Sequence, residues 1–190
     1  MECKWSFKVD SVAPTITGAS TSATGIYTSK PFTVSASDTG GSGLDSLYVY
    51  GGKYTSYQSV GSSVTITGTD WDDLYRFYAK DKASGQSSYY YVNFDQTKPT
   101  GKFCNASGNE ISGYSSTDFY YEATDNSCGV SYCQYQTPGS STWVSYVSGS
   151  VISRDSTNGT YNFRCVDYCG NTSDTSSIIL DTVVPTLTLY

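Results

Sequence analysis

The chain has 190 residues, a formal net charge of −6, and a composition rich in Tyr (19) and Gly (18) but without histidine. Its 11 Lys and Arg residues are dispersed, which excludes a nucleic-acid surface and a basic membrane-binding patch, because both require clustered cations. No apolar run approaches the roughly 20 residues that cross a bilayer, so membrane insertion of this segment is also excluded.

Residue usage points to an all-β chain. Tyr, Thr, Ser and Val are abundant and strong helix formers are few, so we expect essentially no α-helix. Gly and short polar clusters interrupt the chain at intervals typical of short strands. Six cysteines in a chain without histidine are typical of an extracellular or cell-surface protein, where disulfides persist.

A recurring junction motif organises the chain. The pattern Asp-x-x-x-Pro-Thr occurs at residues 10–15, 95–100 and 181–186, which sets a period of about 85 residues. The segments between these copies also match in order, since the alternating stretch at 32–38 returns at 119–125. We therefore predict an internal repeat.

The period predicts the domain boundaries. Residues 1–9 are expected to be the last strand of a preceding repeat, residues 10–94 a first complete repeat, and residues 95–180 a second, disulfide-stabilised one. Residues 181–190 are expected to be the first strand of a following repeat. The chain would then be a window cut from a longer array.

Strand patterning within each repeat predicts half-buried antiparallel sheets. In residues 32–38 and 75–81 every second side chain is apolar, and the second pattern returns at 161–167. Gly, Ser, Asn and Asp turns separate about seven such short strands in each repeat. Two sheets of this kind, packed face to face, form a β-sandwich.

Together these landmarks resemble bacterial immunoglobulin-like tandem repeats of cell-surface proteins and adhesins. The matching motifs are the junction Asp with Pro-Thr, the Asp-x-x-x-Gly-Val loop that begins at Asp125, and the late Tyr-x-Phe-x-x-x-Asp-x-x-Gly-Asn that begins at Tyr161. The resemblance covers nearly the whole chain. It implies tandem immunoglobulin-like sandwiches and a role in a stalk or adhesin, without naming a ligand.

Two cysteines of the second repeat occupy core positions of the first. Cys133 takes the place of Leu47, and Cys165 takes the place of Ala79. Their strands are neighbours in an immunoglobulin-like sandwich, so we predict a disulfide between Cys133 and Cys165. Four cysteines permit three pairings, and a zinc site with Cys-x4-Cys and Cys-x3-Cys spacing is the competing interpretation.

The remaining cysteines lie nearer the ends of the sandwich. Cys128 and Cys169 are in loops that share one end of this fold, which predicts a second disulfide between them. Cys104 has no obvious local partner, and Cys3 belongs to the incomplete repeat. Either could be a free thiol or form an intermolecular bond.

Acidic residues recur in loops that meet at one end of each predicted sandwich. The expected clusters are two trios, Asp10, Asp38 and Asp81, and Asp95, Asp125 and Asp167. Calcium prefers several carboxylate oxygens, so an ion at each junction would stiffen the array. The alternative is that each Asp accepts hydrogen bonds from loop N–H groups. No other cofactor is expected.

Tyrosine is the other excess. Several tyrosines alternate along predicted strands and could form a stacking platform for a glycan or a partner protein: Tyr48, Tyr50, Tyr89, Tyr91 and Tyr120. Tyrosine also suits half-exposed strands, so a purely structural role is the alternative.

Motifs for catalysis are missing from the sequence. There is no histidine base, no Gly-rich phosphate loop and no Gly-x-Ser-x-Gly elbow, so we do not expect an enzyme. The predicted function is an extracellular structural or adhesive stalk, whose partners are neighbouring repeats of the same polypeptide. The alternatives are a module that binds a host glycan or surface protein, and an accessory module of a larger surface enzyme.

Overall fold

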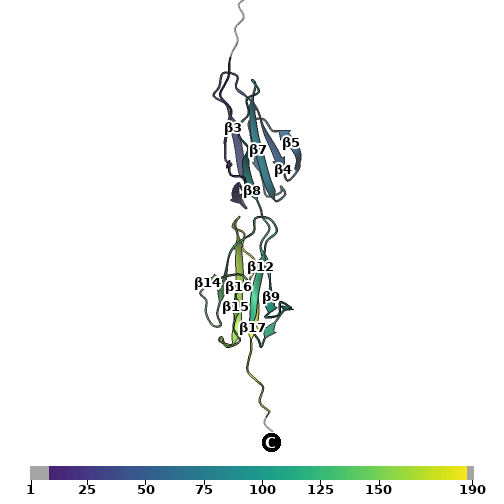
Figure 1. Cartoon of the computed structure of the whole chain (residues 1–190), viewed down its shortest axis with the longest axis vertical. Coiled ribbons are helices and arrows are strands. Elements are labelled where there is room, and N and C mark those ends of the chain that lie inside the picture. The colour runs from purple at the N-terminus through teal and green to yellow at the C-terminus, as the bar shows by residue number, and fades with distance from the viewer. Residues whose placement is uncertain (1–8, 188–190) are drawn as a thin grey trace, which may run out of the picture. The chain divides into compact units, whose positions relative to one another are not determined.

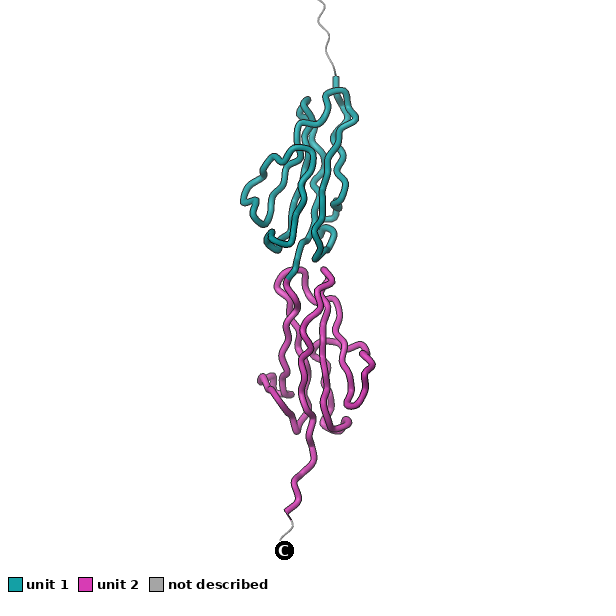
Figure 2. Tube along the Cα trace, turned by 180° about the vertical axis from the view of Figure 1, so that it is seen from behind, with its two compact units in different colours: residues 1–96 teal, residues 97–190 magenta. Residues whose placement is uncertain are grey.

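The computed structural model describes residues 9–187, which divide between two compact units that span 1–96 and 97–190 of the chain (Figure 2). Every regular element of the described residues is a β-strand. The described residues contain no helix that is long and apolar enough to cross a membrane. The predicted all-β fold is therefore confirmed.

The first unit consists of two sheets (Figure 1). The smaller is antiparallel, with its strands in the spatial order β1 (Thr15–Thr17), β3 (Phe32–Ser37) and β6 (Ser63–Ile66). The larger has the spatial order β2 (Ile26–Thr28), β8 (Tyr90–Phe94), β7 (Asp73–Asp81), β4 (Leu44–Gly51) and β5 (Tyr54–Ser59). Strand β2 runs parallel to β8, whereas the other pairs are antiparallel.

The second unit repeats this plan. Its four-stranded sheet has the order β10 (Glu110–Ile111), β9 (Thr100–Asn105), β12 (Phe119–Thr124) and β15 (Val151–Ile152). Its five-stranded sheet has the order β11 (Tyr114–Ser115), β17 (Ser176–Leu180), β16 (Gly159–Asp167), β13 (Val130–Gln136) and β14 (Val144–Tyr146). Strand β11 runs parallel to β17, as β2 does to β8.

The core of each unit forms between its two sheets. In the first unit the fully buried Val34 on the smaller sheet packs in one cluster with Leu47 and Phe77 on the larger. In the second, Phe119 and Phe163 join the two sheets in the same way. This confirms the predicted immunoglobulin-like sandwich, because alternation buries one face of each strand.

A buried tyrosine is the third residue of the long strand of each larger sheet. The hydroxyl of Tyr75 donates to the Trp71 carbonyl at 2.9 Å, and the hydroxyl of Tyr161 donates to the Thr157 carbonyl at the same distance. This link, four residues back along the chain, is the tyrosine corner of immunoglobulin-like folds. It ties the turn to the core in both units.

Two details differ from the predicted plan. The described residues form eight strands in the first unit and nine in the second, rather than about seven, because strands of only two or three residues, such as β2 and β11, add to the number. At the ends, residues 1–8 and 188–190 lie outside the described residues, so most of the predicted preceding strand and Cys3 are not described. Residues 181–187 form no strand.

Candidate functional site

The first aspartate trio comes together in the first unit. Asp10 lies ahead of β1, Asp38 directly follows β3, and Asp81 is the last residue of β7. One carboxylate oxygen from each lies within 4.8 Å of the others. The three loop positions that the sequence suggested therefore form one cluster of negative charge.

Loop hydrogen bonds orient Asp10 and Asp38. The Asp10 carboxylate accepts bonds from the Ser42 amide at 2.8 Å, from the Ser42 hydroxyl and from the Val12 amide. The bonds from Ser42, and then that from Val12, hold the pKa of Asp10 below its usual range. Asp38 accepts a bond from the Gly40 amide at 2.9 Å. Both side chains are thus held as turn-forming acceptors.

Asp81 is the most buried member of the trio, at 4% exposure. Its Oδ1 accepts the Ala83 and Gly85 amides, each at 2.8 Å. A Cβ at Gly85 would collide with Asp81 Oδ2, so only glycine lets the chain pass this close to the carboxylate. The turn after β7 is therefore built around the carboxylate.

One oxygen of the trio is left unsatisfied. Asp38 Oδ2 is buried and has no hydrogen-bond partner, which is unusual for a charged group because burial without a partner is costly. Among the described residues, the ion pairs join Lys53, Lys98 and Lys102 to other carboxylates, and none reaches this trio. The cluster therefore combines three carboxylates, the ligand type that calcium prefers, with one buried oxygen that has no hydrogen-bond partner.

The second unit repeats part of this arrangement. Asp125 Oδ1 accepts the Ser127 and Gly129 amides, while Asp125 Oδ2 is buried without a partner. An oxygen of Asp125 lies within 4.8 Å of one of Asp167, whose carboxylate accepts both the backbone and side-chain N–H groups of Asn171. Asp95 follows β8 in the first unit and is fully buried, and its part in the second trio stays a prediction.

The predicted core disulfide is confirmed. Cys133 and Cys165 are directly paired on β13 and β16 and are bonded, across a sequence separation of 32 residues. Leu47 and Ala79 are paired at the same register on β4 and β7. The alignment of the two repeats was therefore correct to the residue in this part of the sheet.

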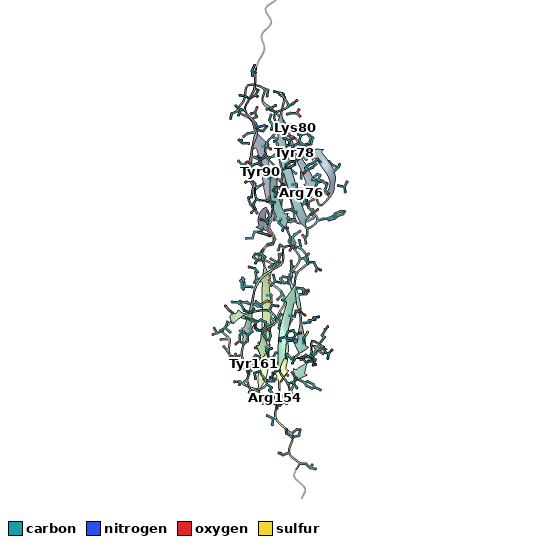
Figure 3. The ribbon with its side chains drawn as sticks, in the orientation of Figure 1. Arg76, Tyr78, Lys80, Tyr90, Arg154 and Tyr161 are labelled. Atoms are coloured by element: carbon teal, nitrogen blue, oxygen red, sulfur yellow. A yellow bond between two sulfur atoms is a disulfide. The ribbon has the colours of Figure 1, made fainter. Side chains whose placement is uncertain are left out.

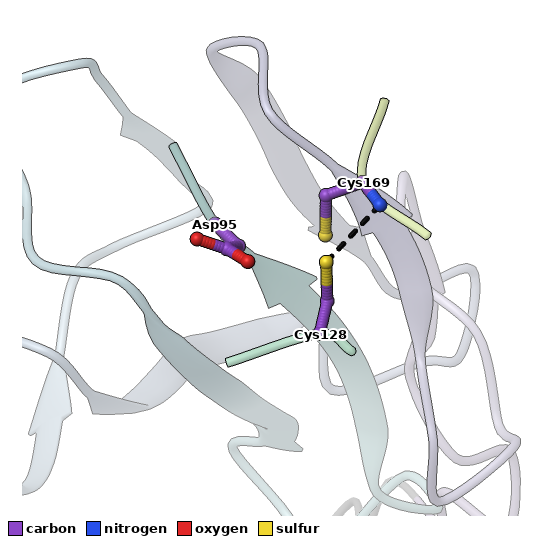
Figure 4. Close-up of side chains that lie close together, drawn as sticks. All are labelled: Asp95, Cys128 and Cys169. Carbon is purple, nitrogen blue, oxygen red and sulfur yellow. Dashed lines mark hydrogen bonds between the residues drawn. The ribbon is translucent and has the colours of Figure 1, made fainter. Parts of the chain in front are cut away.

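The loop cysteines lie close together in the second unit. The Cys169 amide donates to Cys128 Sγ at 3.1 Å, and the two sulfur atoms lie within 4.8 Å of one another (Figure 4). Both side chains are buried. The loops hold these two cysteines in proximity, and the predicted second bridge between them stays a prediction. Cys104 is buried on β9 and has no disulfide partner among the described residues.

Tyrosines gather on the outer side of the larger sheet of the first unit. We call this surface the tyrosine face and define it by five residues, Tyr48, Tyr50, Tyr57, Tyr78 and Tyr89. Adjacent rings have centroids 4.8–6.1 Å apart, so they form one continuous aromatic surface. Tyr57 and Tyr89 are the most open, at 38% and 42% exposure.

Two cations belong to this surface. The Arg76 guanidinium lies 5.1 Å from the centre of the Tyr50 ring, and the Lys80 ammonium lies 5.7 and 5.8 Å from the rings of Tyr48 and Tyr78. These are cation–π distances. Figure 3 labels Arg76, Tyr78 and Lys80, which alternate along β7.

The sequence identified only part of this face. It named Tyr48, Tyr50 and Tyr89, and it named Tyr91, which pairs with Arg76 across β8 and β7. It also named Tyr120, which lies on β12 of the other unit and does not belong to the face. Tyr57, Tyr78 and the two cations were missed, although the period-2 alternation of β7 could have indicated the side chains on that strand.

The corresponding surface of the second unit has different chemistry. Gln134, Gln136, Asn162 and Arg164 occupy the register positions of Tyr48, Tyr50, Arg76 and Tyr78. Arg164 donates twice to the Gln134 side chain, at 3.0 and 2.8 Å, and lies over the Trp143 ring. The polar groups of this surface therefore satisfy one another.

No protein-family model and no curated protein sequence matches the chain. Among solved structures, it is similar to the fibronectin(III)-like modules of Clostridium thermocellum CbhA, with 16% sequence identity and a TM-score of 0.32. The similarity covers 87% of this chain and 92% of that chain. A TM-score this low carries no argument about activity, so the fold assignment rests on the strand pairing of the two units.

Proposed function

We propose that the chain is a non-catalytic segment of an extracellular stalk, in which immunoglobulin-like repeats act as spacers within a larger cell-surface or fibrous protein. The observation that carries this proposal is recurrence. Both units have the same order in the larger sheet, the same tyrosine corner and aspartates at matching loop positions. Such a repeated unit is typical of arrays whose function is reach and spacing.

The chemistry of the loops supports a structural role. The aspartates accept backbone N–H bonds that shape turns, and the disulfide joins neighbouring strands of one sheet. The proline of each junction restricts the chain to extended conformations. Resistance to unfolding at a cell surface follows from these features without any reacting group.

Small-angle X-ray scattering of the 190-residue chain tests the spacer role. A compact globule of this length would have a radius of gyration of about 16 Å. We expect a clearly larger value and the asymmetric distance distribution of an elongated particle. A radius of gyration near that of the compact globule would contradict the proposal.

We also propose that the trio of Asp10, Asp38 and Asp81 holds calcium. Carboxylate oxygens are the ligands that calcium prefers. A bound cation would also compensate the buried Asp38 Oδ2, which has no hydrogen-bond partner. The ion would offset two of the three negative charges and fix the loops after β3 and β7 against the chain that enters β1. The competing role for these aspartates is turn formation alone.

Calcium is expected to raise the Tm of the first unit, and a chelator should reverse this increase. Saturation at a hundredfold excess over the Kd shifts the Tm of a domain of this size by roughly 10–20 °C. Asp38→Asn should abolish the shift, whereas Asp155→Asn, which removes the same charge from an exposed site in the other unit, should retain it. Equal responses of both variants would show that the acids serve the turns only.

The loop cysteines complete the structural proposal. We propose that Cys128 and Cys169 form a second bridge, because their loops hold the two sulfur atoms within 4.8 Å. The bond would join the turn after β12 to the turn after β16 and close the same end of the unit as Asp125 and Asp167.

The tyrosine face favours a second function beside spacing, the binding of a glycan or a surface protein. Contiguous exposed aromatic surface of this kind marks interaction sites in soluble proteins. The matching face of the second unit lacks it, so any such binding would belong to the first unit.

A further inference from the structure

The tyrosine face is not something the fold requires. At the register positions of Tyr48, Tyr50 and Tyr78, the second unit builds the same sheet with glutamine and arginine. Those residues are satisfied by hydrogen bonds among themselves. Because the second unit builds the same sheet without tyrosine at these positions, the concentration of tyrosine in the first unit calls for another explanation.

The rings form one connected cluster rather than scattered surface residues. Tyr78 is stacked on Tyr48 at 4.8 Å and meets Tyr57 and Tyr89 edge-on at 5.0 and 5.5 Å, while Tyr57 also contacts Tyr50. Neighbouring rings fix one another, so little side-chain freedom is lost when a ligand binds. Burial among the other rings raises the pKa of the Tyr57 and Tyr78 hydroxyls, which remain hydrogen-bond donors at neutral pH.

The cations of the face have no acidic partner. Among the described residues, Lys53, Lys98 and Lys102 each form an ion pair, whereas Arg76 and Lys80 form none and lie over tyrosine rings. In a chain with 17 acidic and 11 basic residues, Arg76 and Lys80 place two positive charges on this face. The Asp45 carboxylate accepts a bond from the Tyr48 hydroxyl at 3.5 Å, but no ion pair of the described residues joins it to either cation. Charge complementarity therefore selects an anionic ligand.

We propose that the tyrosine face binds an acidic polysaccharide. The sugar C–H groups would pack on the rings, and Arg76 and Lys80 would pair with carboxylate or sulfate groups of the polymer. A guanidinium matches a carboxylate with two parallel hydrogen bonds, which gives Arg76 the larger share of the specificity. This inference rests on the second proposed function and not on the spacer role.

A polysaccharide fits the face better than an acidic protein. Protein hot spots are dominated by a few anchors buried in pockets, surrounded by contacts that exclude water. Here five rings form one cluster over the outer side of a sheet, with neighbouring centroids 4.8–6.1 Å apart, and each carries a polar hydroxyl. A hydroxyl-rich polymer can pack its sugar units on such connected rings and form hydrogen bonds with their hydroxyl groups.

Affinity electrophoresis of the 190-residue chain, followed by calorimetric titration, tests the proposal. The probes are polygalacturonate as the acidic polysaccharide, dextran as a neutral one, and polyglutamate as an acidic polypeptide. We expect binding to polygalacturonate that weakens as salt rises from 50 to 200 mM, with much weaker binding to the other two.

Variants then locate the site. The double variant Arg76→Gln/Lys80→Gln should weaken polygalacturonate binding at least tenfold, and Tyr57→Ala, which alters an exposed side chain, should weaken it severalfold. The control is Arg164→Gln, which removes the cation from the matching face of the second unit and should leave the affinity unchanged. Unchanged thermal unfolding of the first unit would show that the weaker binding is not a folding defect.

The outcomes distinguish a failure of the acidic-polysaccharide inference from a failure of the more general binding function. Equal binding to dextran would overturn the acidic ligand but leave a glycan-binding module. Equal binding to polyglutamate would overturn the polysaccharide in favour of an acidic protein. Loss of affinity in Arg164→Gln comparable to that of the double variant would place the site elsewhere. If none of the probes binds, both the inference and the binding function fail, while the spacer role stands.

Discussion

Phe163→Ala is expected to lower the free energy of unfolding of the second unit by about 3–5 kcal/mol, the usual cost of removing a fully buried phenylalanine. The Phe163 side chain is completely buried at the centre of the core. Its ring centroid lies within 6.5 Å of those of Phe103, Phe119, Tyr121, Tyr135 and Tyr146.

The size of this effect follows from the arrangement of the rings. Those five rings come from both sheets, so alanine at position 163 would leave a cavity in the layer between them. Small domains have only about 5–15 kcal/mol of stability, and the loss would be a large part of it. Scanning calorimetry should show one transition shifted strongly downward and the other unchanged.

Phe77→Ala provides the matched experiment in the first unit. Phe77 is also fully buried and contacts Phe32 edge-on, at a ring distance of 6.5 Å. It should destabilise the first unit and spare the second. If either substitution shifted both transitions equally, the two units would not unfold independently, and their description as separate cores would be wrong.

Removal of the Cys133–Cys165 disulfide is expected to cost the second unit about 3–4 kcal/mol. In the chain-entropy account, a bond that closes a loop of this length, with a separation of 32 residues, restricts the unfolded chain by that amount. Reductant should therefore lower the transition of the second unit, while the first unit, which has Leu47 and Ala79 at these positions, serves as an internal control.

The first unit also supplies the best replacement. Cys133→Leu/Cys165→Ala installs the residue pair that the first unit packs at the same register, whereas Cys133→Ala/Cys165→Ala leaves space unfilled. The leucine variant should recover part of the loss through packing, although the restriction of the unfolded chain is gone. If strong reductant left the unfolding temperatures of both units unchanged, the predicted contribution of the disulfide would be wrong.

Alkylation of the non-reduced chain distinguishes one bridge from two. Of the six cysteines, two should react after denaturation if both proposed bridges form, and four if only Cys133–Cys165 exists. Peptide mapping would identify Cys128 and Cys169 in the second case.

Local patterns in the sequence predicted most of the fold. Alternation of apolar and polar residues in 32–38 and 75–81 identified β3 and β7, because a strand presents successive side chains to opposite faces. The comparison of the repeats predicted that Cys133 and Cys165 would meet, because equivalent strands keep the same register when the same faces must be buried. Very short strands such as β2 escaped prediction, since their parallel pairing with β8 is non-local.

The sequence by itself indicated the period, the buried face of each strand and the loop positions of the aspartates, because each depends on spacing along one strand or on matching between segments of the chain. The cysteine pair also required the resemblance to immunoglobulin-like sandwiches, since four cysteines permit three pairings. The tertiary structure alone decided which tyrosines touch, that Tyr120 lies apart from the rest, and that Asp38 Oδ2 is left without a partner. These properties depend on which side chains meet across strands and loops, and that is fixed only once the sheets have paired and packed.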